Sequence, residues 1–241
     1  MRVLFVVFAL QLSAGATAAA QEWEQYVSTQ DGFTLNFPGT PKVTEGSWTS
    51  QLNYTLPMRV YSAEKGRERY SLTVVDYSTI EQQGIERAKT CPPGNANCRA
   101  NAPTSLGPGY SHHDERGAIV YGTFKLLQRD AKLTYMAWEW QDMVEGQLVQ
   151  LTNADRSRTF AWTGMHAHKL YILEGTVPPG SAEPGLFQQS MGWVDKDGRG
   201  IRYQTIYSNS YHGMGVYPVP PLAGAGRGAG AGTEAPGVRG R

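Results

Sequence analysis

A short alternating segment near the start of the chain constrains the fold more than any other feature. Phe33, Leu35 and Phe37 alternate with the polar residues Thr34 and Asn36, which is the period of a strand with one buried face. An Asp-Gly turn signal precedes this segment, and a Pro-Gly-Thr-Pro sequence follows it, in which neither proline can donate a hydrogen bond to a sheet. We therefore expect the later segments of the chain to supply further strands that cover its apolar face.

Further segments show the patterns of strands and helices. Apolar residues recur as in strands at 56–60, 70–74, 118–127, 133–140, 148–151, 159–162 and 169–174, whereas residues 43–54 suit either a strand or a loop. Helical spacing predicts helices at 78–89 and 185–194. Because these helices lie between and after runs of strands, the sequence predicts an α+β fold with a mainly antiparallel β-sheet flanked by a few helices.

The first 20 residues have the three parts of a secretory signal peptide. Arg2 supplies the positive start, residues 3–12 form an apolar run, and Ala18, Ala19 and Ala20 form a cleavage signal before Gln21. A membrane anchor needs about 20 apolar residues, and this run has roughly half of that length. We therefore expect an exported protein, periplasmic or extracellular, with no membrane span after cleavage.

Charge and composition limit what the rest of the chain can be. The 22 Lys and Arg residues face 21 Asp and Glu, and removal of Arg2 with the signal peptide makes the balance neutral. A nucleic-acid surface needs clustered positive charge, so we expect no nucleic-acid partner. Residues 21–217 have the length of a single domain. Residues 218–241 contain seven Gly and four Pro and predict a disordered tail.

The two cysteines, Cys91 and Cys98, lie in a Pro/Gly-rich stretch around 90–113 that predicts a long loop. In an exported protein such a pair predicts a local disulfide bond, which would constrain the unfolded chain by roughly 2.5 kcal/mol. The alternative, a redox-active pair, usually has a Cys-x-x-Cys spacing at the start of a helix. Six intervening residues, two of them proline, favour the structural bridge.

Two stretches resemble a known family. Trp23 and the later segment Asp31-Gly-Phe-Thr-Leu-Asn-Phe-Pro-Gly-Thr-Pro41 resemble the start of PsbP-like domains, the fold of the extrinsic photosystem II subunit P and of many small exported bacterial proteins. Lys169-Leu-Tyr-Ile-Leu-Glu174, a Pro-rich loop and Leu186-Phe-Gln-Gln-Ser-Met191 are similar to the end of that domain. The resemblance covers about residues 22–203. It implies an antiparallel sheet flanked by helices and mostly non-catalytic accessory or binding roles.

Two histidines are the candidate metal ligands. In a strand, the sequence Met165-His166-Ala167-His168 would place both imidazoles on one face about 6–7 Å apart, which suits two ligands of one metal. A structural zinc site needs four ligands and a catalytic one needs three ligands and a water. A metal-binding periplasmic protein that uses His166 and His168 is therefore an alternative hypothesis.

A group of aromatic residues is the candidate ligand groove. Tyr135, Trp138, Trp140, Trp162 and Tyr171 lie on consecutive predicted strands, and such a group can stack on sugars or apolar ligands. Alternate strand positions must also fill the interior, and this core role accounts for most of the group. An aromatic-groove binder of small ligands is therefore the second alternative.

Catalytic motifs do not occur in the sequence. It has no Gly-x-Ser-x-Gly, no His-Glu-x-x-His and no Gly-rich phosphate loop after a strand. The sequence thus predicts that the protein is not an enzyme and needs no cofactor. The main hypothesis is a non-catalytic exported accessory or binding protein of the bacterial cell envelope, whose partner is an envelope protein or a small ligand.

Overall fold

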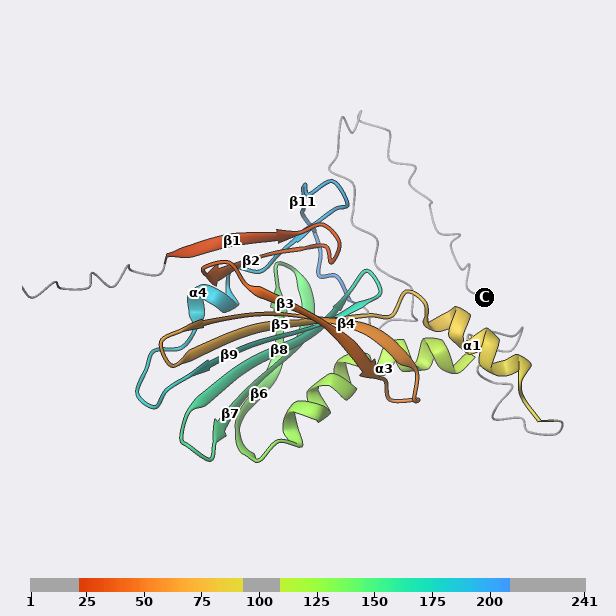
Figure 1. Ribbon diagram of the computed structural model, residues 1–241, viewed down its shortest axis with the longest axis horizontal. Helices are drawn as coiled ribbons and strands as arrows, with labels where there is room; N and C mark the ends of the chain where they lie inside the picture. The colour runs from red at the N-terminus through yellow and green to blue at the C-terminus, as the bar shows by residue number, and fades with distance from the viewer. Residues whose placement is uncertain (1–21, 93–108, 209–241) are drawn as a thin grey trace, which may run out of the picture.

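The computed structural model describes residues 22–92 and 109–208, and within these ranges the chain forms eleven strands and three helices (Figure 1). The elements, in chain order, are β1 (Trp23–Ser28), β2 (Phe33–Pro38), β3 (Lys42–Thr49), β4 (Thr55–Lys65), β5 (Glu68–Asp76), α1 (Ile80–Lys89), α3 (Gly109–Leu127), β6 (Ala131–Gln141), β7 (Val144–Asn153), β8 (Arg158–His166), β9 (Lys169–Val177), α4 (Gly185–Gln188), β10 (Gly192–Val194) and β11 (Gly200–Ile201).

The strands form two sheets in which all neighbouring strands are antiparallel. The smaller sheet has the order β1-β2-β10-β11, and the larger has the order β3-β4-β5-β9-β8-β7-β6. The predicted α+β fold with mainly antiparallel pairing is therefore confirmed. Residues 43–54, which suited either a strand or a loop, contribute strand β3. The finer assignment to the PsbP-like family stays a prediction.

The elements are stacked in three layers. The smaller sheet lies on one face of the seven-stranded sheet, and α1 and α3 lie on its other face (Figure 1). One apolar cluster fills the space between the two sheets, and a second fills the space between the helices and the larger sheet. The larger sheet is therefore the middle layer, because both of its faces are partly buried.

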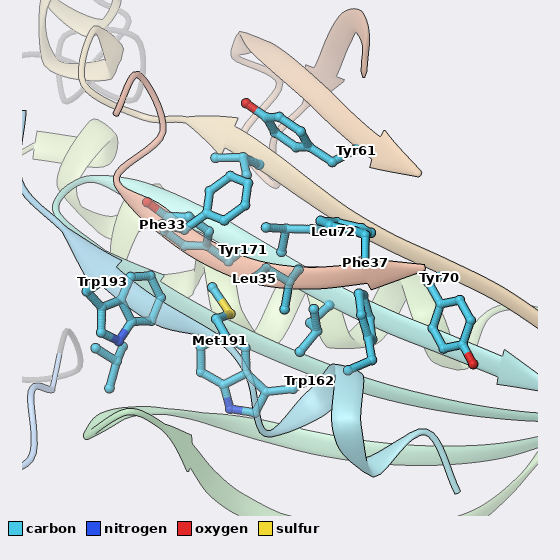
Figure 2. Packing of buried hydrophobic residues seen from close by; sticks show 14 of the residues in the cluster. Phe33, Leu35, Phe37, Tyr61, Tyr70, Leu72, Trp162, Tyr171, Met191 and Trp193 are labelled. Atoms are coloured by element: carbon cyan, nitrogen blue, oxygen red, sulfur yellow. The ribbon is translucent and has the colours of Figure 1, made fainter. Parts of the chain in front are cut away.

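Strand β2 provides the apolar face that the sequence predicts. Phe33, Leu35 and Phe37 are completely buried and point toward the larger sheet, where Leu72 and Tyr171 lie (Figure 2). Burial of each such side chain contributes about 1.5–3 kcal/mol. This strand therefore anchors the smaller sheet on the larger one.

The strand predicted at 118–127 is wrong, because these residues form the second half of helix α3. Ala118, Gly122 and Leu126 are buried at intervals of four, which is the helical period, and they lie against β8 and β9. The segment is apolar on almost every side, so alternation alone does not distinguish a strand from a helix. The predicted loop around 90–113 is also too long, since α3 already begins at Gly109.

The helix predicted at 185–194 is wrong in its second half. Helix α4 ends at Gln188, and Gly192–Val194 forms strand β10 instead. Trp193 pairs with Phe33 on one side and with Ile201 on the other. Pairing with distant strands has therefore overridden the local helical spacing.

Several predictions concern residues outside the described ranges. The signal peptide (1–20), Cys98 with its predicted bond to Cys91, and the tail (218–241) all stay predictions. In residues 22–92 and 109–208, no helix is both long enough and apolar enough to cross a membrane.

Candidate functional site

A polar cavity lies on the helix-covered face of the seven-stranded sheet, at the end that the helices leave open. Its volume is about 820 Å³. Lys42, Ser62, Ser71 and Glu174 are successive cross-strand partners on β3, β4, β5 and β9, so they form one row across this face. Further along the same strands, apolar residues such as Ile172 pack under the helices instead. The cavity thus begins where the apolar contacts end.

Three charged side chains of the cavity, those of Arg129, Glu174 and Asp155, are held by neighbours. Arg129, in the turn after α3, donates to both carboxylate oxygens of Glu174, with Nη2 lying 3.0 Å from Oε1. The hydrogen bond to Glu174 raises the pKa of Arg129 above its usual value. Asp155 accepts hydrogen bonds from the Ser157 hydroxyl at 2.6 Å and from the Ser157 backbone N–H at 2.9 Å, which lower the pKa of Asp155. Asp155 is therefore a carboxylate at neutral pH.

Hydroxyl and amide groups complete one wall of the cavity. Asn153 Nδ2 donates to Ser157 Oγ at 2.9 Å and to Thr159 Oγ1 at 3.0 Å. The hydroxyls of Thr159 and Thr176 are 2.9 Å apart and bridge β8 to β9. This connected network fixes the orientation of several hydroxyl groups at the cavity edge, which favours directional hydrogen bonds to a bound molecule.

The titratable side chains that line the cavity in the described ranges include no histidine and no cysteine. A general acid at neutral pH needs a carboxyl group with a raised pKa. Asp155 has a lowered pKa, and Glu174 forms an ion pair with Arg129. The arrangement offers fixed hydrogen-bond donors and acceptors, which is what recognition of a ligand requires.

His166 and His168 do not share a strand face. His166 ends β8 and Lys169 begins β9, and Ala167 and His168 form the turn between them with φ values of 46° and 63°. Positive φ at both positions is typical of a tight hairpin turn. The turn directs the two imidazoles to different neighbours. Strand geometry, on which the metal hypothesis depends, is therefore absent at this position.

His166 lies in a buried aromatic group at the edge of the inter-sheet core. Its ring centroid is 4.2 Å from that of Trp193, and its Nε2 atom is 2.5 Å from the Tyr203 hydroxyl. Burial lowers the pKa of His166 to about 3, so the imidazole is neutral at pH 7. Its Nδ1 atom is buried without a hydrogen-bond partner among the described residues. Packing and one hydrogen bond account for this side chain.

His168 points to the helix layer instead. Its Nδ1 atom is 2.7 Å from Glu115 Oε1 on α3, and its side chain is 62% exposed. The hydrogen bond to Glu115 raises the pKa of His168. Within the described part of the chain, no group of three or more His, Cys, Asp or Glu side chains is arranged to hold a metal ion. The predicted ligands are not brought together.

The five aromatic residues of the predicted groove are divided between two places. Trp162 and Tyr171 are fully buried between the sheets (Figure 2), whereas Tyr135, Trp138 and Trp140 are about half exposed or more on strand β6. A second cavity, of about 460 Å³, is lined by a single aromatic residue, Trp140. The structure thus forms no groove from all five.

The polar cavity itself was not foreseen from the sequence. Its lining comes from β3, β4, β5, β7, β8, β9 and the turns at 128–130 and 154–157, so no local motif contains it. The one local signal is a repeat of Ser and Thr at strand positions that would normally be apolar, such as Ser71 and Thr176. Comparison with known proteins gives no further guidance here, since no family model and no curated protein matches the chain.

Proposed function

We propose that the protein is a non-catalytic, exported binding protein of the bacterial cell envelope, and that its polar cavity holds a small, uncharged, hydroxyl-rich molecule such as a saccharide. The observation that carries this proposal is the cavity of about 820 Å³, in which Arg129 and Glu174 already pair with each other and the side chains of Asn153, Thr159 and Thr176 are oriented by hydrogen bonds. Export rests on the signal peptide predicted for residues 1–20.

The pairing of Arg129 with Glu174 favours an uncharged ligand at this part of the cavity. An anionic ligand would compete with Glu174 for Arg129, and a cationic ligand would compete with Arg129 for Glu174. Either exchange leaves one of the two charges without its partner, and the cost falls mainly on Glu174, whose side chain is only 15% exposed. A hydroxyl group can donate to the free lone pairs of a carboxylate and accept from a guanidinium without breaking the pair. Sugars carry many such groups.

The floor of the cavity suits a flat polar molecule. Ser62 and Ser71 present short side chains on adjacent strands, so a ligand can approach the sheet closely. A volume of about 820 Å³ lies within the range of roughly 300–1,000 Å³ that is usual for small-molecule sites. The non-catalytic role implied by the PsbP-like resemblance agrees with this proposal.

Isothermal titration calorimetry with neutral mono- and oligosaccharides, sugar phosphates and uronic acids tests the proposal. We expect at least one neutral saccharide to bind and charged derivatives of the same sugar to bind at least tenfold more weakly, which corresponds to about 1.4 kcal/mol. The Ser71→Phe variant fills the cavity floor, so it is expected to reduce affinity by tenfold or more.

Ser47→Phe is the matched control, because Ser47 lies on edge strand β3 outside the cavity lining. Its affinity should equal that of the unmodified protein. Stronger binding of charged sugars, equal loss in both variants, or absence of binding to every neutral saccharide in the panel would contradict the proposal.

A further inference from the structure

Strand β6 is an edge of the seven-stranded sheet and exposes large apolar side chains. Met136, Trp138 and Trp140 are 44%, 61% and 53% exposed. Their partners on β7 are Val149, Gln147 and Glu145, so the three side chains lie on the same face of the sheet. In the described part of the chain, β6 pairs with β7 alone, and its other backbone edge faces away from the sheet.

The opposite edge strand, β3, has the usual protection against pairing. Lys42 and Glu45 are exposed charged residues on it, and charges of this kind prevent the addition of a further strand. In β6, by contrast, the seven residues 135–141 contain one charged side chain, Glu139, and three exposed aromatic ones. An exposed apolar edge of this kind is normally covered by another strand.

We propose that two copies of this chain pair through their β6 strands, antiparallel and about a two-fold axis at Trp138, and so join their larger sheets into one continuous sheet. A two-fold interface requires a surface that is complementary to itself. The proposal is independent of the ligand cavity, because no residue of β6 lines it.

The sequence of β6 is self-complementary in this register. With the axis at Trp138, Trp138 lies opposite its own copy, and Met136 lies opposite Trp140 of the second copy. Cross-strand pairs of large apolar side chains stabilise a sheet by about 0.2–1 kcal/mol each. On the other face, Glu139 lies opposite Ala137, so no like charges meet.

Other registers are less favourable. An axis at Glu139 would place two carboxylates opposite each other, and an axis at Lys132 would place two ammonium groups opposite each other, which is destabilising. A register irregularity between Leu133 and Tyr135 interrupts the regular pairing of β6. The regular segment is therefore 135–141, and its central residue is Trp138.

The size of the surface predicts a dimer of moderate affinity. Aromatic side chains bury about 150–250 Å² each, so the exposed fractions on β6 correspond to roughly 500 Å² of apolar surface per copy. Paired backbone and neighbouring side chains bring this toward the approximately 800 Å² per partner of a standard interface. We therefore expect dissociation in the micromolar range.

Helix α3 extends the same surface. It packs on the sheet face that carries Trp138, and its exposed side presents Val120, Phe124 and Leu127. A two-fold axis through antiparallel edge strands runs perpendicular to the sheet, so the α3 helices of both copies would flank the joined strands on one face. Trp138 and Trp140 of β6 would then lie in the groove between them.

Sedimentation-velocity ultracentrifugation across the micromolar range tests the proposal. The purified protein should shift from monomer to dimer as concentration rises. Trp138→Lys places a positive charge against its own copy at the axis, so dimer formation should weaken at least a hundredfold. Because Trp138 is mostly exposed, this variant should keep the circular dichroism spectrum and the melting temperature of the parent. Val43→Lys, an exposed apolar-to-lysine change on β3, is the matched control and should leave the dimer unchanged.

The register is tested by spin labels on single-cysteine substitutions. A label at position 137 should give a shorter distance between copies than one at Lys132, since position 137 lies next to the axis and its label leaves Trp138 in place. A monomer at every concentration, a dimer that survives Trp138→Lys, a dimer lost in Val43→Lys, or a shorter distance at position 132 than at 137 would each overturn the proposal.

Discussion

Arg59 binds the carboxylate of Asp31 with two parallel hydrogen bonds, from Nε to Oδ2 at 2.6 Å and from Nη2 to Oδ1 at 2.5 Å. Asp31 lies in the turn between β1 and β2 and is completely buried, whereas Arg59 lies in β4. The Tyr61 hydroxyl and the Lys169 ammonium donate to the same carboxylate at 2.7 and 2.9 Å. This one carboxylate therefore links the two sheets.

Replacement of Asp31 by Asn should destabilise the protein by about 3 kcal/mol or more. The variant keeps the shape of the side chain but removes the carboxylate that pairs with Arg59 and Lys169, which are only 15% and 16% exposed. Arg59 then keeps only Glu45, whose Oε1 atom lies 4.0 Å from Nη1. Urea unfolding of Asp31→Asn and of the parent measures the difference. Asp130→Asn, at an exposed turn, is the control and should change stability by less than about 0.5 kcal/mol. Equal effects of the two substitutions would contradict this prediction.

The same carboxylate should make stability depend on acid. Burial alone would raise the pKa of Asp31, but hydrogen bonds from Arg59, Tyr61 and Lys169 outweigh burial and lower it to about 2. The unfolded chain, with a pKa near 3.9, takes up the proton first as the pH falls. The contribution of Asp31 is thus complete above about pH 4 and is lost between pH 4 and 2. Unfolding free energies of the parent and Asp31→Asn should converge across this window.

His166 should make the stability of the protein depend on pH over a wider acidic range than Asp31 does. Its folded pKa of about 3 lies below the unfolded value of 6.5, so the unfolded state binds the proton first as the pH falls below 6.5. The stability that the neutral imidazole contributes is present above pH 6.5 and is lost as the pH falls toward 3. The His166→Phe variant cannot be protonated, so its stability relative to the parent should improve by about 1.4 kcal/mol per pH unit below 6.5. Urea unfolding at pH 7 and pH 5 measures this change, and a constant difference would refute it.

The pKa values of the two histidines near the β8–β9 turn should be shifted in opposite directions. The hydrogen bond to Glu115 raises the pKa of His168, whereas burial lowers that of His166. An NMR titration of the imidazole protons should show His168 titrating above pH 6.5 and His166 remaining neutral at pH 5. Glu115→Gln should return His168 to its ordinary range and leave His166 unchanged. If one metal bridged the two side chains instead, added zinc would shift both sets of signals together.

Gly164 should not tolerate a side chain. The Trp162 ring lies so close to Gly164 that a Cβ atom at position 164 would overlap its Cη2 atom. A Cβ atom at Gly146 would likewise lie 2.6 Å from Trp162 Nε1. Gly164→Ala should therefore destabilise the protein by about 1–3 kcal/mol, because the fully buried indole must move. Gly200→Ala is the control, since nothing lies within 4 Å of a Cβ atom there. Thermal unfolding compares the two, and an equally small effect at both positions would show that the indole can shift freely.

The sequence by itself determined which segments have one apolar side. Phe33, Leu35 and Phe37 are fully buried as expected, and the strands predicted at 159–162 and 169–174 are present as the antiparallel pair β8 and β9. These features depend on alternation and on turn residues within a few positions. Such signals are local, so they can be recognised without knowledge of the rest of the fold.

Only the tertiary structure decided which apolar sides are covered and by what. Trp162 and Trp138 have the same strand-like environment in the sequence, but Trp162 lies in a central strand under the smaller sheet and Trp138 lies at the uncovered edge. The apolar run at 118–127 forms a helix, and the positions that it buries against β8 and β9 recur at the helical period. The polar cavity and the link from Arg59 to Asp31 join residues that are far apart in the chain. Burial is a property of two surfaces in contact, and a single segment encodes only one of them.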